Sequence, residues 1–169
     1  MTFLGSRLSD VTSTDKPERQ TPMNESHRHL FSDVVTQDIA IECVDAAGTV
    51  TMLDAALGYD PADPYAVTAT FFTGGGEVVW TFARDLLSRG LTDPAGEGDV
   101  HIWPCLDANG RATVIIELCS PDGELVAQAK TQDVYRFVSR SLAMVPAGME
   151  ASHCDIDNMI DQLLNSEKI

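Results

Sequence analysis

The sequence predicts an α+β fold in which antiparallel sheets of about seven to eight strands are combined with helices. Three observations support this class. Apolar residues alternate with polar ones in short segments separated by Gly, Asn and Pro turns; a short helical pattern lies between two groups of such segments; and after Thr131 the apolar period changes to 3.6 residues. Hairpin-linked strands followed by carboxyl-terminal helices are typical of a sheet that helices cover on one face.

The first two strands are predicted before residue 54. Ile39, Ile41 and Cys43 fall on one side of a strand over residues 36–44, and a turn at residues 45–48 leads to a second strand over residues 49–53. Gly58 and the prolines after it favour a connecting loop over residues 54–63.

A hairpin is predicted at the centre of the chain. Val67, Ala69 and Phe71 alternate with threonines, which is the pattern of a strand with one face on a core. The glycines at 74–76 accept the positive φ of a tight reversal, so a strand through residues 78–80 is expected to return antiparallel to the first.

A two-turn helix is expected directly after this hairpin. Thr81 is its predicted N-cap, and Phe82, Leu86 and Leu87 share its apolar side. Gly90 stands where the helix is expected to end.

Three more strands are predicted after a loop at residues 92–98. Pro104 is expected to end the first of them, and the Asn-Gly and Pro-Asp-Gly sequences supply two hairpin turns. The middle strand is apolar on nearly both faces and is therefore expected to be central. These strands cover residues 99–103, 113–118 and 125–129, with turns at 107–110 and 120–123.

Two helices complete the predicted fold. The first begins near Thr131 and has an apolar stripe of Val134, Phe137, Val138 and Leu142. The second follows Asp155 as N-cap, and its stripe consists of Ile156, Met159, Ile160, Leu163 and Leu164. This last stripe packs either on the chain's own sheet or a neighbouring subunit, or in the groove of a partner protein.

Composition predicts a disordered amino-terminal arm over residues 1–30 and a single folded domain over residues 31–169. The arm is rich in Ser, Thr, Pro and charged residues and has almost no apolar period. Eleven basic and 26 acidic residues give a net charge of −15, which makes nucleic acid and anionic membrane surfaces unlikely partners. No stretch has the roughly 18 apolar residues of a membrane span, so we expect a cytoplasmic protein without membrane insertion.

Motifs for catalysis, metal binding or cofactor binding are not found, so we expect neither an enzyme nor a cofactor. No nucleophile elbow accompanies His101 or His153. Residues 153–155 (His-Cys-Asp), which Cys105 could join, are the most metal-like cluster, although adjacent residues rarely bind one ion together. The glycines at 74–76 precede a strand rather than a helix and therefore do not form a phosphate loop. Trp80 and Trp103 are better explained by core packing than by base stacking.

The central stretch resembles the SsgA-like sporulation and cell-division regulators of actinobacteria. The resemblance rests on motifs that occur in order within residues 63–104 and extends more loosely over residues 34–164. The signature positions, which are also the candidate partner contacts, are Asp63, Pro64, Tyr65, Trp80, Phe82, Arg84, Asp85, Leu86, Leu87, Asp99, Trp103 and Pro104. The Arg84-Asp85 pair can serve equally as an internal ion pair or cap interaction, or as a contact to a partner.

The resemblance implies a Whirly-like fold that assembles as a homotrimer. It also implies a non-enzymatic adaptor of sporulation-specific division, active in septum-site selection, septation or spore maturation. Its expected place is the division septum. The implied partners are proteins of the division machinery, including the tubulin-like GTPase FtsZ directly or indirectly, and related SsgA-like proteins. The alternatives are a module that binds single-stranded nucleic acid and a chaperone-like module for septal or wall enzymes.

Overall fold

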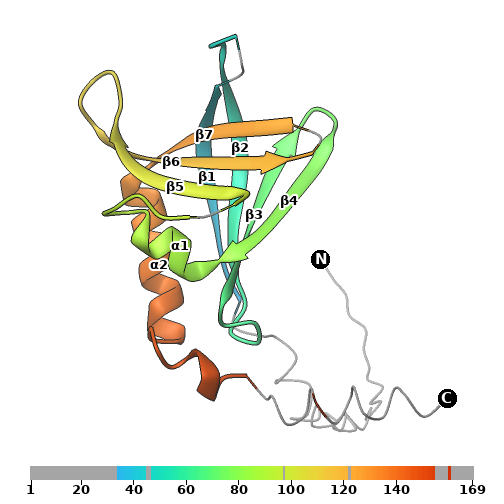
Figure 1. The fold of residues 1–169 in the computed structure, drawn as a ribbon, viewed down its shortest axis with the longest axis vertical. Helices are drawn as coiled ribbons and strands as arrows, with labels where there is room; N and C mark the ends of the chain where they lie inside the picture. The colour runs from blue at the N-terminus through green and yellow to red at the C-terminus, as the bar shows by residue number, and fades with distance from the viewer. Residues whose placement is uncertain (1–33, 45–46, 97, 122, 155–159, 161–169) are drawn as a thin grey trace, which may run out of the picture. The chain divides into compact units, whose positions relative to one another are not determined.

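The structure, a computed structural model, describes residues 34–44, 47–96, 98–121, 123–154 and 160. Within them the strands are β1 (Val35–Val44), β2 (Val50–Tyr59), β3 (Ala66–Thr73), β4 (Gly76–Ala83), β5 (Val100–Leu106), β6 (Ala112–Ser120) and β7 (Gly123–Lys130). They form one antiparallel sheet in the order β4-β3-β2-β1-β7-β6-β5. The pairing of β1 with β7 joins two groups of consecutive strands, which cross at a steep angle in Figure 1.

Helices lie on one side of this curled sheet. Helix α1 (Arg84–Arg89) connects the two strand groups, and helix α2 (Thr131–Met144) follows β7. A short 3-10 turn, η2 (Glu150–Ser152), comes after α2. Helix α2 contacts β1, β6, β7 and α1, so the two helices lie beside each other in Figure 1. The predicted α+β class, with a short helix between two strand groups, is confirmed.

The core lies between the sheet and α2, and the apolar residues of the alternating sequence pattern fill it. Val67, Ala69 and Phe71 of β3 are all buried, and so are Val134 and Phe137 of α2. Strand β6 is buried on both faces over much of its length, as its apolar sequence predicts, because it lies inside the sheet between β7 and β5.

The three predicted hairpin turns are confirmed. Thr73 pairs with Gly76, so Gly74 and Gly75 form the two-residue loop between β3 and β4. The β5–β6 loop contains Gly110 with a φ of 76°, a conformation that glycine adopts readily. Ser120 pairs with Gly123 across the β6–β7 turn.

Strand β2 continues through Tyr59, so the predicted loop over residues 54–63 is wrong up to that residue. Leu57 and Tyr59 are buried on the core face, each about 1% exposed. Gly58 marks close approach of a neighbouring strand rather than a break, since a Cβ there would lie 2.5 Å from Thr68 Oγ1. The prolines come after the end of the strand.

The predicted start of the short helix is also wrong. Strand β4 continues to Ala83, whose extended backbone (ψ 131°) precedes the helix without any side-chain cap, so Thr81 is not the N-cap. Phe82 belongs to the strand and is buried in the core. The helix begins at Arg84, whose backbone N–H donates to the carbonyl of Tyr65 at 2.7 Å. Gly90 follows the last helical residue, as predicted.

Pro104 lies inside β5, although the sequence suggested that it ends the strand. It is opposite Val114 of β6, and β5 continues to Leu106. Because β5 is an edge strand, a residue without an N–H is tolerated on its free side.

The predicted arm over residues 1–30 and most of the predicted helix after Asp155 lie outside the described residues, and the domain boundary stays a prediction. Helix α2 agrees with the predicted first helix, and Leu142 of its stripe is partly buried against the core. Cys43 packs partly buried against the core, and Cys119 is half-buried. No helix in the described ranges is both long enough and apolar enough to cross a membrane.

Candidate functional site

Arg84 is the centre of the site because its buried side chain joins four segments of the chain. Only 3% of it is exposed, although it is the first residue of α1. Its Nη1 lies 3.1 Å from Tyr59 Oη at the end of β2, and its Nη2 lies 2.6 Å from Oε1 of Glu150 in η2. Nη1 also faces the carbonyls of Ser141 at 3.1 Å and Val145 at 2.7 Å, at the end of α2.

The surroundings of Arg84 satisfy its charge. A guanidinium stays protonated in proteins, so it must be paired when it is buried. The carboxyl end of a helix carries partial negative charge, and Arg84 reaches the carbonyls there. The guanidinium also lies 4.9 Å from the centre of the Tyr59 ring, within the range of a cation–π contact.

Arg84 affects the pKa values of its two ionisable partners, Glu150 and Tyr59. The pKa of the Glu150 carboxyl lies below its usual range because its own backbone N–H donates to it, and because Arg84 and the backbone N–H of Gly148 also donate. Burial raises the pKa of the Tyr59 hydroxyl, against the opposing effect of Arg84. Tyr59 donates its own hydrogen to the carbonyl of Pro64 at 3.2 Å. Glu150 is therefore charged and Tyr59 neutral around neutral pH.

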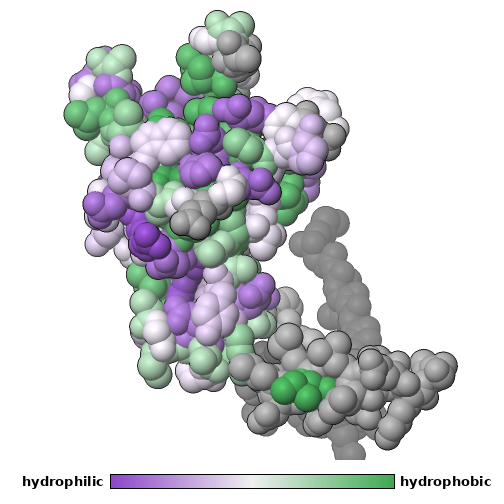
Figure 2. All heavy atoms as spheres, in the orientation of Figure 1, coloured by the Kyte–Doolittle hydropathy of each residue, from purple (hydrophilic) through white to green (hydrophobic). Residues whose placement is uncertain are grey.

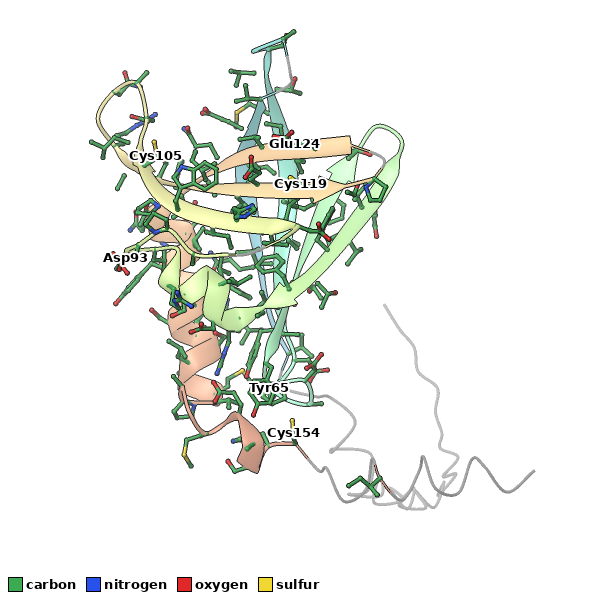
Figure 3. The ribbon with its side chains drawn as sticks, viewed as in Figure 1. Tyr65, Asp93, Cys105, Cys119, Glu124 and Cys154 are labelled. Carbon is green, nitrogen blue, oxygen red and sulfur yellow. The ribbon has the colours of Figure 1, made fainter. Side chains whose placement is uncertain are left out.

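A small cleft of about 110 Å³ lies over this buried network. Arg84 and Glu150 form part of its wall, and Tyr65, Asp85, Ser88 and Ala147 complete most of the lining. Tyr65 is 54% exposed, and Figure 3 shows it close to the turn that carries Cys154. The cleft is too small for a drug-sized ligand, but an exposed tyrosine on a rigid base suits contact with a protein.

The signature positions divide into a buried frame and an exposed rim. Phe82, Arg84, Leu87 and Pro64 are buried, and Leu86 is half-buried. The exposed members in the cleft lining are Tyr65 and Asp85, and exposed Asp63 lies two residues before Tyr65 in the connection between β2 and β3. Asp85 Oδ2 lies 3.4 Å from Nη1 of Arg89, one turn further along α1, so of the alternatives that the sequence left open, an ion pair between Arg84 and Asp85 is not formed. Arg84 pairs with Glu150 instead.

The other signature positions lie away from this cleft, and none of them belongs to its lining. Trp80 is half-buried and packs against the core, as the sequence analysis favoured. Trp103 is half-buried on edge strand β5, where it is opposite Ile115 of β6. Asp99 and Pro104 are exposed, and the Asp99 carbonyl accepts a hydrogen bond from the N–H of Cys119 at 2.8 Å.

Sequence reasoning did not find two residues of the site. Tyr59 was assigned to a loop, and Glu150 lies 66 residues after Arg84 in a stretch without apolar period. The only available signal was the arginine inside an otherwise apolar run, because a charged residue there needs a partner from elsewhere in the chain.

The weak metal and catalytic candidates are not brought together. His153 is exposed, and Figure 3 shows Cys105 and Cys154 at opposite ends of the described fold. Asp155 lies outside the described residues. His101 Nδ1 lies 3.3 Å from Oε2 of Glu117 on the neighbouring strand. Among the described residues, no three His, Cys, Asp or Glu side chains are grouped closely enough to hold a metal ion.

Apolar side chains gather on the surface at the two projecting hairpins, which Figure 2 shows at the top of the view. Val50 of the β1–β2 hairpin is 58% exposed, and Leu106 at the start of the β5–β6 loop is 65% exposed. No signature position of the cleft rim lies on either hairpin.

Comparison with known proteins identifies close relatives. Residues 53–150 match the family described as "Streptomyces sporulation and cell division protein, SsgA". The sporulation-specific cell division protein SsgB of Kineococcus radiotolerans is 42% identical over 140 residues, which cover 82% of this chain and 83% of that protein. SsgB of Streptomyces coelicolor is 42% identical over 135 residues, or 79% of this chain and 98% of that protein.

Two solved structures are similar to the fold. The crystal structure of an SsgA-like sporulation-specific cell division protein from Thermobifida fusca aligns with a TM-score of 0.70 at 36% identity, covering 78% of this chain and 96% of that chain. A structure from work on SsgB mutations and longitudinal division in Streptomyces coelicolor gives a TM-score of 0.67 at 42% identity, covering 71% and 94%.

Proposed function

Because the chain belongs to the SsgA family of sporulation and cell division proteins, we propose that it acts in sporulation-specific cell division as a non-enzymatic adaptor. Its partners are proteins of the division machinery, and the contact surface is the exposed rim of the Arg84 cleft, formed by Asp63, Tyr65 and Asp85. It works at the septum as a homo-oligomer. The relatives' names support the role in sporulation-specific division, while the adaptor mechanism, the partners and the assembly are proposed here.

The observation that carries the proposed surface is the exposure of Tyr65 on a rigid support. Its side chain is 54% exposed, yet its backbone carbonyl accepts from Arg84, which in turn reaches β2, α2 and η2. Tyrosines presented in this way lose little conformational entropy on binding and often dominate protein interfaces. The acidic rim also fits a protein partner better than a phosphate backbone.

Replacing Tyr65 with Ala tests this surface in sporulating cells that carry the variant in place of the native gene. We expect a folded protein, judged by its near-UV circular dichroism, that no longer recovers division proteins on purification and that gives fewer sporulation septa. Truncation of an interface tyrosine of this type typically costs about 2 kcal/mol or more, or about 30-fold in Kd.

Phe72→Ala is the matched control, because Phe72 is an aromatic residue of β3 that is also largely exposed, at 42%, and does not line the cleft. It should leave septation and partner recovery unchanged. Normal septation with Tyr65→Ala would rule out this surface, and normal septation after deletion of the gene would rule out the role itself. Salt-sensitive recovery of nucleic acid in place of proteins would support the nucleic-acid alternative.

A further inference from the structure

The outer face of α2 forms an exposed, shallow hollow of about 400 Å³. Its floor follows one side of the helix, where Tyr135 is 62% exposed and Ala143 lies two turns further on. Arg136 and Arg140, one turn apart, form one flank of this hollow. The lining is mostly apolar because it includes the aliphatic stems of the arginines.

The hollow is basic in a chain of net charge −15, because Arg136 and Arg140 line it and none of the described acidic residues belongs to its lining. Across Gln132 it adjoins a second hollow that both Lys130 and Glu42 line, and there Arg111 is already paired with Asp107 at 2.6 Å. Arg136 Nη1 lies 3.5 Å from Asp133, and Arg140 Nη1 donates to the Thr36 carbonyl at 3.2 Å. Each guanidinium has five N–H donors, so these single contacts leave donors for further carboxylates.

Residues 155–169 have the complementary pattern. Their predicted helical stripe is apolar, and Ile160, the member of it that the structure describes, is 47% exposed and therefore open to a cover. Asp157 and Asp161 are four residues apart in the sequence, which places them on one flank of the predicted helix. When each helix is viewed from its amino-terminal end, the two aspartates lie on the same side of their apolar stripe as Arg136 and Arg140 do on α2. When two helices pack antiparallel along their apolar stripes, the sides that correspond in this view face each other.

Chain length fits the same arrangement. Fifteen helical residues are about 22 Å long, close to the length of the 14-residue α2. The chain leaves the carboxyl end of α2 through η2 and Cys154, so a helix that begins at Asp155 can return along α2. An antiparallel register that sets Asp157 opposite Arg140 also sets Asp161 opposite Arg136, since the members of each pair are four residues apart in the sequence.

We propose that residues 155–169 fold back on the outer face of α2 of the same chain as an antiparallel helix. Their apolar stripe covers Tyr135 and Ala143, while the two aspartates pair with Arg136 and Arg140. The recognised ligand is thus an acidic amphipathic segment, and this surface is separate from the Tyr65 rim. The inference does not rest on the proposed function.

Hydrogen exchange of the full-length chain, followed by mass spectrometry, tests the proposal. Residues 156–164 should exchange at least about tenfold more slowly than an unstructured peptide of the same sequence. Arg136→Glu with Arg140→Glu should remove this protection and leave the exchange of β2–β7 unchanged, whereas β1 loses the contact of Arg140 with the Thr36 carbonyl. The matched control is Arg89→Glu with Arg111→Glu, which alters the net charge by the same amount without changing the lining of the Tyr135 hollow. This variant should keep the slow exchange of residues 156–164.

A charge swap makes the test specific. Adding Asp157→Lys and Asp161→Lys to the Arg136→Glu, Arg140→Glu variant should restore slow exchange, because the pairs reform with opposite sign. Unprotected exchange in the native chain, or equal effects of the two double variants, would overturn the proposal. Protection that disappears on dilution would also overturn it, since the segment would then be docked on a second copy.

Discussion

Replacing Arg84 with Met should destabilise the protein more than any exposed substitution on α1. Methionine keeps most of the length and apolar volume of the side chain but removes the guanidinium. The carbonyls of Ser141 and Val145 and the carboxylate of Glu150 then lose their shared donor. Water reaches this position poorly, because Arg84 is only 3% exposed.

The expected magnitude follows from these contacts. Removing one partner of a buried ion pair costs about 3–5 kcal/mol, mainly because the remaining polar groups stay desolvated. For a domain of this size, each kcal/mol lowers Tm by about 2–4 °C. We therefore expect Arg84→Met to lower Tm by about 10 °C, as measured by thermal and urea unfolding of the full chain. Arg84→Lys should give an intermediate loss, since one ammonium cannot reach the same set of oxygens.

Arg89→Met is the matched control for this experiment. Arg89 lies on the same helix and pairs with Asp85, but the two side chains are 62% and 71% exposed. Such exposed pairs contribute at most about 1 kcal/mol. Equal stability of Arg84→Met and Arg89→Met would refute the view that the Arg84 network holds β2, α1, α2 and η2 together.

Two further predictions concern the same region. The pKa of Glu150 is lowered by its own backbone N–H and by Arg84, so its stabilising contribution should be present above the pKa of an unfolded glutamate and be lost as pH falls through the lower folded pKa. Urea midpoints between about pH 7 and 3 should accordingly fall less steeply for Glu150→Gln than for the native chain, and parallel curves would contradict the assignment. Gly90→Ala should lower the urea midpoint, because its Cβ would lie 2.7 Å from Cβ of the fully buried Ile102; Gly74→Ala, with open space around it, is the control and should have little effect.

Local patterns in the sequence determined most of the secondary structure. Alternation in Val67, Ala69 and Phe71, the glycine and Asn-Gly turns, and the 3.6-residue stripe of α2 each depend on residues close in the chain, so they could be read directly. The twelve signature positions likewise identified the region that contains the site, and through it the family.

Tertiary structure decided what local patterns could not. Pro104 stands within a strand because β5 lies at the edge of the sheet, and β2 passes Gly58 because the neighbouring strand packs closely there. The pairing of Arg84 with Glu150 joins residues 66 positions apart, and no spacing rule connects them. The sequence by itself therefore determined the elements and their order. Long-range packing, which appears only when the chain is folded, decided three further features: the joining of the two strand groups through β1 and β7, the burial of Arg84 and the exposure of Tyr65.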